Sequence, residues 1–209
     1  MAEKWEIKKD ALYRPSADVP QIVDVPEIPY AVVSGSGDPN ESEDFAQAVE
    51  ALYGVSYAIK MMPKKGIVPE GYFEYTVPPL SGLWDMEPGR EFDPSRKSEL
   101  RWTLLIRQPS FVDENLFERA RSMAAEKKGG DAVRKLRFES MREGLCCQFL
   151  HVGPFDEEPA SFAKMADFLA AEGYERSERS HHEIYLSDFR KTAPEKLKTI
   201  LRVRIRKSS

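Results

Sequence analysis

The strongest constraint on the fold is a pattern that occurs twice along the chain. Residues 45–52 (Phe-Ala-Gln-Ala-Val-Glu-Ala-Leu) align with residues 162–169 (Phe-Ala-Lys-Met-Ala-Asp-Phe-Leu), and both have the spacing of an amphipathic helix. An apolar stretch and a Gly/Pro-containing loop precede each helix, and two candidate strands follow it. The repeat predicts two strand–helix–strand–strand units within a chain of 209 residues.

Local signals predict where the elements of the two units lie. In the first unit we expect a strand at 30–33, a helix at 42–53 that Ser42 caps and Gly54 ends, and strands at 72–77 and 100–107. In the second unit we expect a strand at 145–151, a helix at 161–171, and strands at 181–187 and 199–206. Helices are expected at 113–127 and 131–141 between the units, and residues 1–29, with four prolines, as an extended surface lead-in.

Composition excludes several classes of function. The net charge is −4 with both signs interspersed, so no basic face for nucleic acid or anionic lipid is expected. No run of about 18 apolar residues occurs, and residues 1–14 lack the apolar region of a secretion signal. We therefore expect a cytoplasmic globular protein that binds neither nucleic acid nor membrane.

The C-terminal residues carry alternating arginines. Arg202, Arg204 and Arg206 alternate with apolar residues, a pattern typical of the solvent-exposed face of an edge strand. A phosphate-binding stripe is the alternative. The two cysteines, Cys146 and Cys147, are adjacent and would point to opposite faces of a strand, so we expect two buried free thiols and no disulfide.

The residues 181–188 (His-His-Glu-Ile-Tyr-Leu-Ser-Asp) hold the most unusual polar pattern. As a strand, they place Glu183 and Tyr185 on one face together with His181. That face either looks at water, where Glu183 pairs with a neighbouring cation, or lines a pocket for a cation, a polar ligand or proton transfer. Only one of the two histidines shares this face, so a metal site is not expected.

Nine segments resemble the GyrI-like small-molecule-binding superfamily in its stand-alone form. Two of them are Val-Pro-Pro-Leu-Ser-Gly-Leu-Trp at 77–84 and His-Val-Gly-Pro-Phe at 151–155. The others, in the same order as in the family, lie at 25–26, 35–40, 51–54, 57–60, 102–109, 182–188 and 196–201. The resemblance extends from about residue 20 to the end of the chain.

The resemblance implies an α+β fold of duplicated βαββ modules with pseudo-twofold symmetry, an antiparallel sheet with helices, and a ligand cleft between the halves. The single domain would span 30–209, with halves at about 30–109 and 145–206 and inserted helices at about 113–141. Members of the family bind drug-like or cationic molecules, and the stand-alone branch is associated with hydrolysis of cyclopropane-bearing DNA-alkylating compounds. Glu183 matches the family's pocket carboxylate.

Further site residues are expected around that carboxylate. A carboxylate in an apolar cleft can hold a cation or exchange a proton with water, and Tyr185 could donate a hydrogen bond to a carbonyl oxygen. Flat ligands need aromatic walls, for which Trp84 is the first choice. Trp102, Tyr53 and Tyr57 are further candidates, for each of which core packing is the alternative. Tyr72 is the last candidate, and the sequence does not say which face of the 72–77 strand lines the cleft.

Three hypotheses for function remain open from the sequence. The protein sequesters a flat aromatic or cationic molecule, or it hydrolyses a cyclopropanoid compound, or it acts on a protein partner as a topoisomerase modulator. The hydrolase hypothesis needs no metal or organic cofactor, because ring strain makes the substrate electrophilic. The residue types of a binding and a catalytic carboxylate are the same, so the sequence does not separate the first two.

Overall fold

The computed structural model describes residues 5–86, 88, 96–128 and 130–208. Its strands are β1 (Gln21–Ser36), β2 (Leu80–Met86), β3 (Leu100–Arg107), β4 (Arg137–Val152), β5 (Tyr174–Arg176), β6 (His181–Tyr185) and β7 (Lys198–Lys207). Its helices are α1 (Glu43–Met61), α2 (Glu114–Lys128), α3 (Gly130–Arg134) and α4 (Glu158–Glu172). Short 3-10 turns are η1 (Ile7–Lys9), η2 (Ala11–Tyr13), η3 (Pro63–Lys65), η4 (Lys97–Glu99), η5 (Phe155–Glu157) and η6 (Pro194–Lys196). Over the described ranges, no helix combines the length and apolar character that a bilayer crossing requires.

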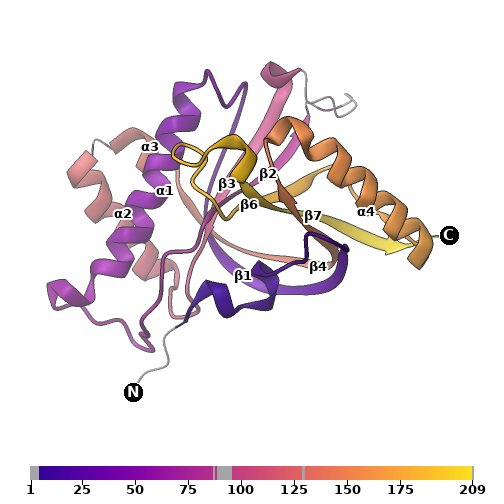
Figure 1. Ribbon diagram of the computed structural model, residues 1–209. Coiled ribbons are helices and arrows are strands. Elements are labelled where there is room, and N and C mark those ends of the chain that lie inside the picture. The colour runs from indigo at the N-terminus through magenta and orange to yellow at the C-terminus, as the bar shows by residue number, and fades with distance from the viewer. Residues whose placement is uncertain (1–4, 87, 89–95, 129, 209) are drawn as a thin grey trace.

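The strands form one antiparallel sheet in the order β4-β1-β3-β2-β6-β7-β5. Because β4 also pairs with β7, six of these strands close into a ring, and β5 lies outside it against β7. Closure pairs the backbone groups that an open sheet would leave at its edges. Figure 1 shows α1, α2 and α3 gathered on one side of the strands and α4 on the other.

The two units of the repeat appear in the topology as β1-α1-β2-β3 and β4-α4-β6-β7. In each unit the last strand pairs with both other strands, and the units join through β1–β4 and β2–β6. This equivalence confirms the predicted α+β fold of duplicated βαββ modules. Helices α2 and α3 are inserted between the modules and contribute to the larger core around α1.

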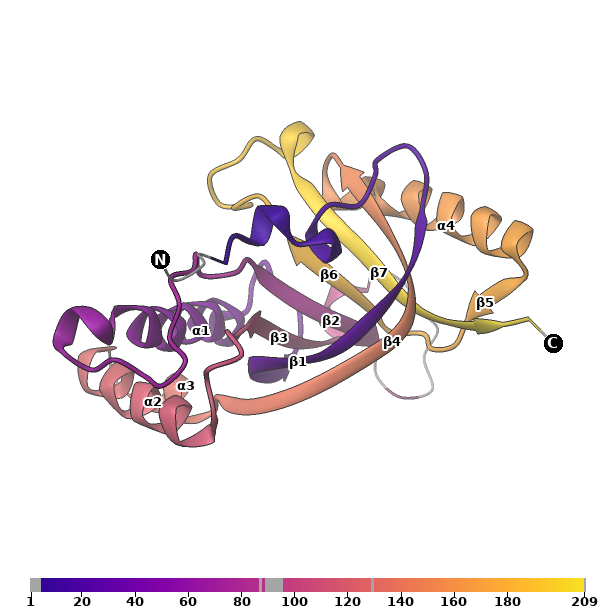
Figure 2. The ribbon, with the colours of Figure 1, turned by 90° about the horizontal axis from the view of Figure 1, so that it is seen from below.

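The inner face of the ring has its own apolar core, which the N-terminal residues cover. Tyr13 of η2 packs with Ile184 of β6 and Ile200 of β7. Figure 2 shows this N-terminal segment over the strands, in indigo. The later part of the expected lead-in is a strand and not a loose extension, because β1 begins at Gln21 and its first part pairs with β4.

Two predicted boundaries in the first module are wrong. Gly54 does not end α1, because Val55 and Ile59 continue its buried face into the core and the helix runs on to Met61. Residues 72–77 form no strand, and Tyr75 makes only an isolated bridge to Trp5. The strand begins at Leu80 instead, after two prolines that have no N–H to donate to a ladder.

Two further predictions fail because long-range pairing decides the structure. The expected helix at 131–141 ends at Arg134, and residues from Arg137 onward pair with β1 as strand β4. The expected edge strand β7 lies between β4 and β6, so Arg202 is buried, at 2% exposure. Arg206, near the end of the strand, is exposed as predicted.

The prediction for the cysteines is confirmed. Cys146 and Cys147 are free, and both are fully buried. They lie on opposite faces of β4 and belong to different apolar clusters. Burial raises the pKa of each thiol to about 12, so neither is a reactive thiolate at neutral pH.

Candidate functional site

A cavity of about 800 Å³ lies between the two modules. Strand β6 supplies its polar floor, because His181, Glu183 and Tyr185 alternate toward the cavity while Ile184 packs on the opposite face. The lining residues from the first module are Pro39, Asn40, Phe45, Trp84, Lys97 and Leu100. Those from the second module are Pro154, Phe155, Asp156, Glu158, Pro159, Phe162, His181, Glu183, Tyr185, Phe189, Thr192, Pro194 and Leu197.

Glu183 is held at both carboxylate oxygens. Its Oε1 lies 2.8 Å from His181 Nε2, and its Oε2 accepts a hydrogen bond of 2.9 Å from the Tyr185 hydroxyl. That hydroxyl in turn accepts a hydrogen bond of 2.8 Å from Trp84 Nε1. Trp84 and Tyr185 thus form a chain of donors that ends on Glu183 and orients its carboxylate.

Tyr185 is a phenol at neutral pH and not a phenolate. Burial, and then the negative charge of Glu183, raise the pKa of Tyr185 well above its usual value. Its single proton points to Glu183. In this ligand-free arrangement the Tyr185 hydroxyl donates to Glu183 and so positions the carboxylate.

A second carboxyl group, that of Glu158, lines the same cavity. Glu158 is the first residue of α4 and is only 6% exposed. Burial, and then the charge of Glu183 and a hydrogen bond to it, raise the pKa of Glu158 to about 10. Among the described residues, no hydrogen-bond partner satisfies the Oε1 atom of Glu158.

Sequence reasoning missed Glu158. The signal available was an acidic loop before the second helix, in which Asp156, Glu157 and Glu158 follow one another. Nothing in that pattern distinguishes the one carboxyl that turns inward. The structure separates them, because Glu157 is exposed and lines a different pocket.

Aromatic rings that the sequence did not single out surround the carboxyl groups. The rings of Phe155 and Phe189 stand edge-on to Tyr185, with centroids 5.9 Å and 5.8 Å from it. Phe162 stands edge-on to His181 at 4.9 Å. The cavity therefore combines flat apolar walls with a carboxylate floor, which suits a flat aromatic or cationic molecule.

The remaining predicted site residues lie outside this cavity. Trp102 is buried in the α1 core, where its ring stands edge-on to Phe45 at 5.2 Å. Tyr53 and Tyr57 line two other pockets beside α1, of about 380 and 740 Å³. Tyr72 packs on Phe111, at 5.3 Å between centroids, so Trp84, Glu183 and Tyr185 are the predicted residues that the fold brings together.

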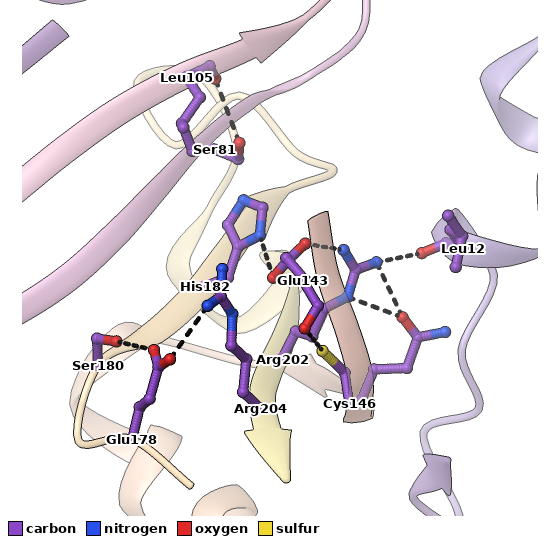
Figure 3. Close-up of polar contacts among 11 residues, drawn as sticks. Leu12, Ser81, Leu105, Glu143, Cys146, Glu178, Ser180, His182, Arg202 and Arg204 are labelled. Carbon is purple, nitrogen blue, oxygen red and sulfur yellow. Dashed lines mark hydrogen bonds and ion pairs between the residues drawn. The ribbon is translucent and has the colours of Figure 1, made fainter. Parts of the chain in front are cut away.

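The opposite face of β6 carries a second buried polar cluster. His182 Nδ1 lies 3.1 Å from Glu143 Oε2, and Arg202 Nη1 donates to Glu143 Oε1 at 2.8 Å. Arg202 also donates to Gln148 and to the backbone oxygen of Leu12, which ties this cluster to the N-terminal segment. Figure 3 shows His182 and Arg202 converging on Glu143 from different strands. In the described part of the chain, no group of three or more His, Cys, Asp and Glu is arranged to hold a metal ion.

Comparison with known proteins identifies the family. The model of the GyrI-like small molecule binding domain matches residues 19–206, so the chain belongs to the GyrI-like family. An uncharacterized conserved protein from Listeria innocua is similar at 40% identity and a TM-score of 0.89, over 96% of this chain and 99% of that one.

Two solved structures described as hydrolases from Listeria innocua are also similar. One is 37% identical with a TM-score of 0.86, covering 96% of this chain and 99% of its own. The other is 38% identical with a TM-score of 0.90, covering 98% of this chain and 100% of its own. Comparison with curated proteins finds no match.

Proposed function

We propose that this GyrI-like domain is a cofactor-independent hydrolase of flat, cyclopropane-bearing alkylating compounds. The observation that carries the proposal is Glu183, a buried carboxylate that His181 and Tyr185 hold in place on the floor of an aromatic cavity. The similarity to two Listeria innocua proteins described as hydrolases supports a catalytic role. The cavity volume of about 800 Å³ is within the range of small-molecule sites.

The reaction requires three groups around the substrate. A water molecule attacks the strained carbon, a base takes the proton of that water, and a donor meets the carbonyl oxygen that gains charge as the carbon–carbon bond breaks. Glu183 is the base, because its two hydrogen bonds fix the direction of its lone pairs. The aromatic walls stack on the substrate and exclude other water molecules.

Sequestration without turnover is the second candidate. The observation that favours it is that both oxygens of Glu183 already have partners and that Tyr185 directs its proton to Glu183. Such a carboxylate attracts a cation without taking part in proton transfer. In this case the protein would protect the cell by binding the compound without converting it.

Turnover of a reactive compound separates the two candidates. We expect the wild-type protein to convert a cyclopropane-fused cyclohexadienone of the duocarmycin type into its ring-opened hydrate, which mass spectrometry detects as the addition of one water. Glu183→Gln should lower the rate about 100-fold or more, because it removes the base. Glu178→Gln is the matched control, since Glu178 is exposed and paired with Arg204 outside the cavity. Tight binding without any product would establish sequestration.

A further inference from the structure

We propose that Glu158 and Glu183 hold one proton between them, and that Glu158 is the acid that protonates the carbonyl oxygen of the substrate. The acid role rests on the proposed hydrolase function, whereas the shared proton is a property of the ligand-free protein. Glu158 thereby takes the donor role that the sequence pattern assigned to Tyr185.

The geometry places two carboxyl groups in one nearly dry site. Glu158 and Glu183 line the same cavity at 6% and 8% exposure, one at the start of α4 and the other within β6. Two carboxylates in contact under these conditions cannot both be ionised, because their repulsion adds to the cost of burial. One proton bound between them removes that repulsion.

The hydrogen bonds indicate which carboxyl carries the proton. Both oxygens of Glu183 have partners, because Oε2 accepts a hydrogen bond from the Tyr185 hydroxyl and Oε1 lies 2.8 Å from His181 Nε2. Glu158 receives no such donor at Oε1, and this oxygen is buried. The proton therefore resides on Glu158, the carboxyl with fewer donors to stabilise a negative charge.

The charged groups around Glu158 do not neutralise it. From β6 it meets Glu183, and from η5 the exposed Asp156 adds a further negative charge. Lys97 lies across the cavity, where it is 3.8 Å from Asp156 and pairs with that residue. Within the described residues, no lysine or arginine forms an ion pair with Glu158 or Glu183. The remaining titratable neighbour is His181 on β6, which lies 2.8 Å from Glu183 and is a cation only when its ring is protonated.

The pair of carboxyl groups binds the same number of protons before and after one turnover. Glu183 takes a proton from water, whose oxygen bonds to the cyclopropane carbon while the strained carbon–carbon bond breaks. The electron pair of that bond moves into the ring and onto the carbonyl oxygen, which takes the proton of Glu158. The product leaves as a phenol with a new hydroxyl group, and the proton on Glu183 returns to Glu158. The pair holds one proton before and after, so no oxidant, reductant or metal is needed.

Infrared difference spectroscopy of the ligand-free protein tests the shared proton. Comparing wild type with Glu158→Gln, we expect the carbonyl band of a protonated carboxylic acid at neutral pH, assigned to Glu158. Glu183→Gln should shift the titration of Glu158 to lower pH, because it removes the neighbouring charge. Glu157→Gln, next in sequence but exposed, should leave the band unchanged. Titration of Glu158 near the ordinary glutamate value of about 4.3 would overturn the proposal.

Kinetics with the cyclopropanoid substrate tests the acid role. Glu158→Gln should lower kcat about 100-fold with little change in binding. The wild-type rate should fall at alkaline pH as Glu158 loses its proton, and this alkaline limb should be absent from the pH profile of the variant. A loss of that alkaline limb in Tyr185→Phe but not in Glu158→Gln would assign the proton to Tyr185 and overturn the acid role. If the wild type shows no turnover, the hydrolase function fails, and the infrared result still decides whether the pair shares a proton.

Discussion

Strand β6 presents a histidine–glutamate pair on each of its faces, and the two pairs differ in their third partner. On the cavity face His181 meets Glu183 at 2.8 Å, and on the inner face His182 meets Glu143 at 3.1 Å. The inner pair is completed by the guanidinium of Arg202, whereas the cavity pair faces the carboxyl of Glu158. The glutamate on the inner face therefore has a cationic partner, whereas the glutamate on the cavity face lies beside a second acidic group.

The pKa values follow this difference. Burial by itself would raise the pKa of Glu143, but His182 and Arg202 outweigh burial and lower it to about 2. Burial and a neighbouring carboxylate act in the same direction on Glu158 and raise its pKa to about 10. A buried carboxylate that is paired with a cation serves the stability of the fold. Two buried carboxyl groups without such a cation can bind a cationic ligand or transfer a proton. On this contrast we base the proposal that the cavity face of β6 is the functional one.

The largest expected effect is the loss of the inner cation. Arg202→Met should lower the free energy of unfolding by about 3–5 kcal/mol, because it leaves Glu143 buried without its guanidinium partner. Urea unfolding followed by circular dichroism measures this loss. Arg206→Met is the control on the same strand, where an exposed pair with Glu175 should cost less than about 1 kcal/mol. Equal costs for the two substitutions would contradict a structural role of the inner cluster.

The inner cluster should also make stability depend on acid pH. The pKa of Glu143 is lower in the folded state, so its contribution is complete above the unfolded value of 4.5 and is lost as pH falls toward about 2. The full contribution is about 3 kcal/mol for a shift of this size. Urea unfolding at about pH 6, 4 and 3 should show a gap between wild type and Glu143→Gln that shrinks with acid. A gap that stays constant over this range would exclude Glu143 as its source.

A substitution in the cavity pair should change ligand binding and not stability. Glu183→Gln should weaken binding of a cationic rhodamine about tenfold, or about 1.4 kcal/mol, and leave the free energy of unfolding nearly unchanged. Binding weakens because the substitution removes the negative charge that attracts the ligand, and stability changes little because no arginine or lysine is left unpaired among the described residues. Fluorescence anisotropy measures the binding. Unchanged affinity would indicate recognition by shape alone.

The smallest expected effect concerns the hydrogen bond from Trp84 to Tyr185. A double-mutant cycle of Trp84→Phe and Tyr185→Phe should give a coupling energy of about 1 kcal/mol in urea unfolding. Both substitutions keep an aromatic ring, so the cycle isolates the bond of 2.8 Å between Nε1 and the hydroxyl. Additive effects would show that the bond does not contribute to holding Glu183 in place.

The sequence by itself determined the repeated module, the strand β3 at Leu100–Arg107, and the alternation that places Glu183 and Tyr185 on one face. These features depend on local periodicity, which can be recognised from neighbouring residues alone. Boundaries set by distant pairing were not determined in this way. Residues from Arg137 onward are strand because β1 lies beside them, and Arg202 is buried because β4 and β6 flank its strand.

Only the tertiary structure decided which polar residues meet in the cavity. Trp84, Glu158 and Glu183 come from three separate elements, and their proximity follows from how the two modules close around the sheet. Trp84 and Trp102 are directly paired on neighbouring strands and belong to the same core, yet Trp84 also lines the cavity and Trp102 does not. A sequence pattern specifies the face of a strand on which a side chain lies. What lies opposite that face depends on contacts between residues far apart in the chain, and those contacts determine burial, charge compensation and pKa.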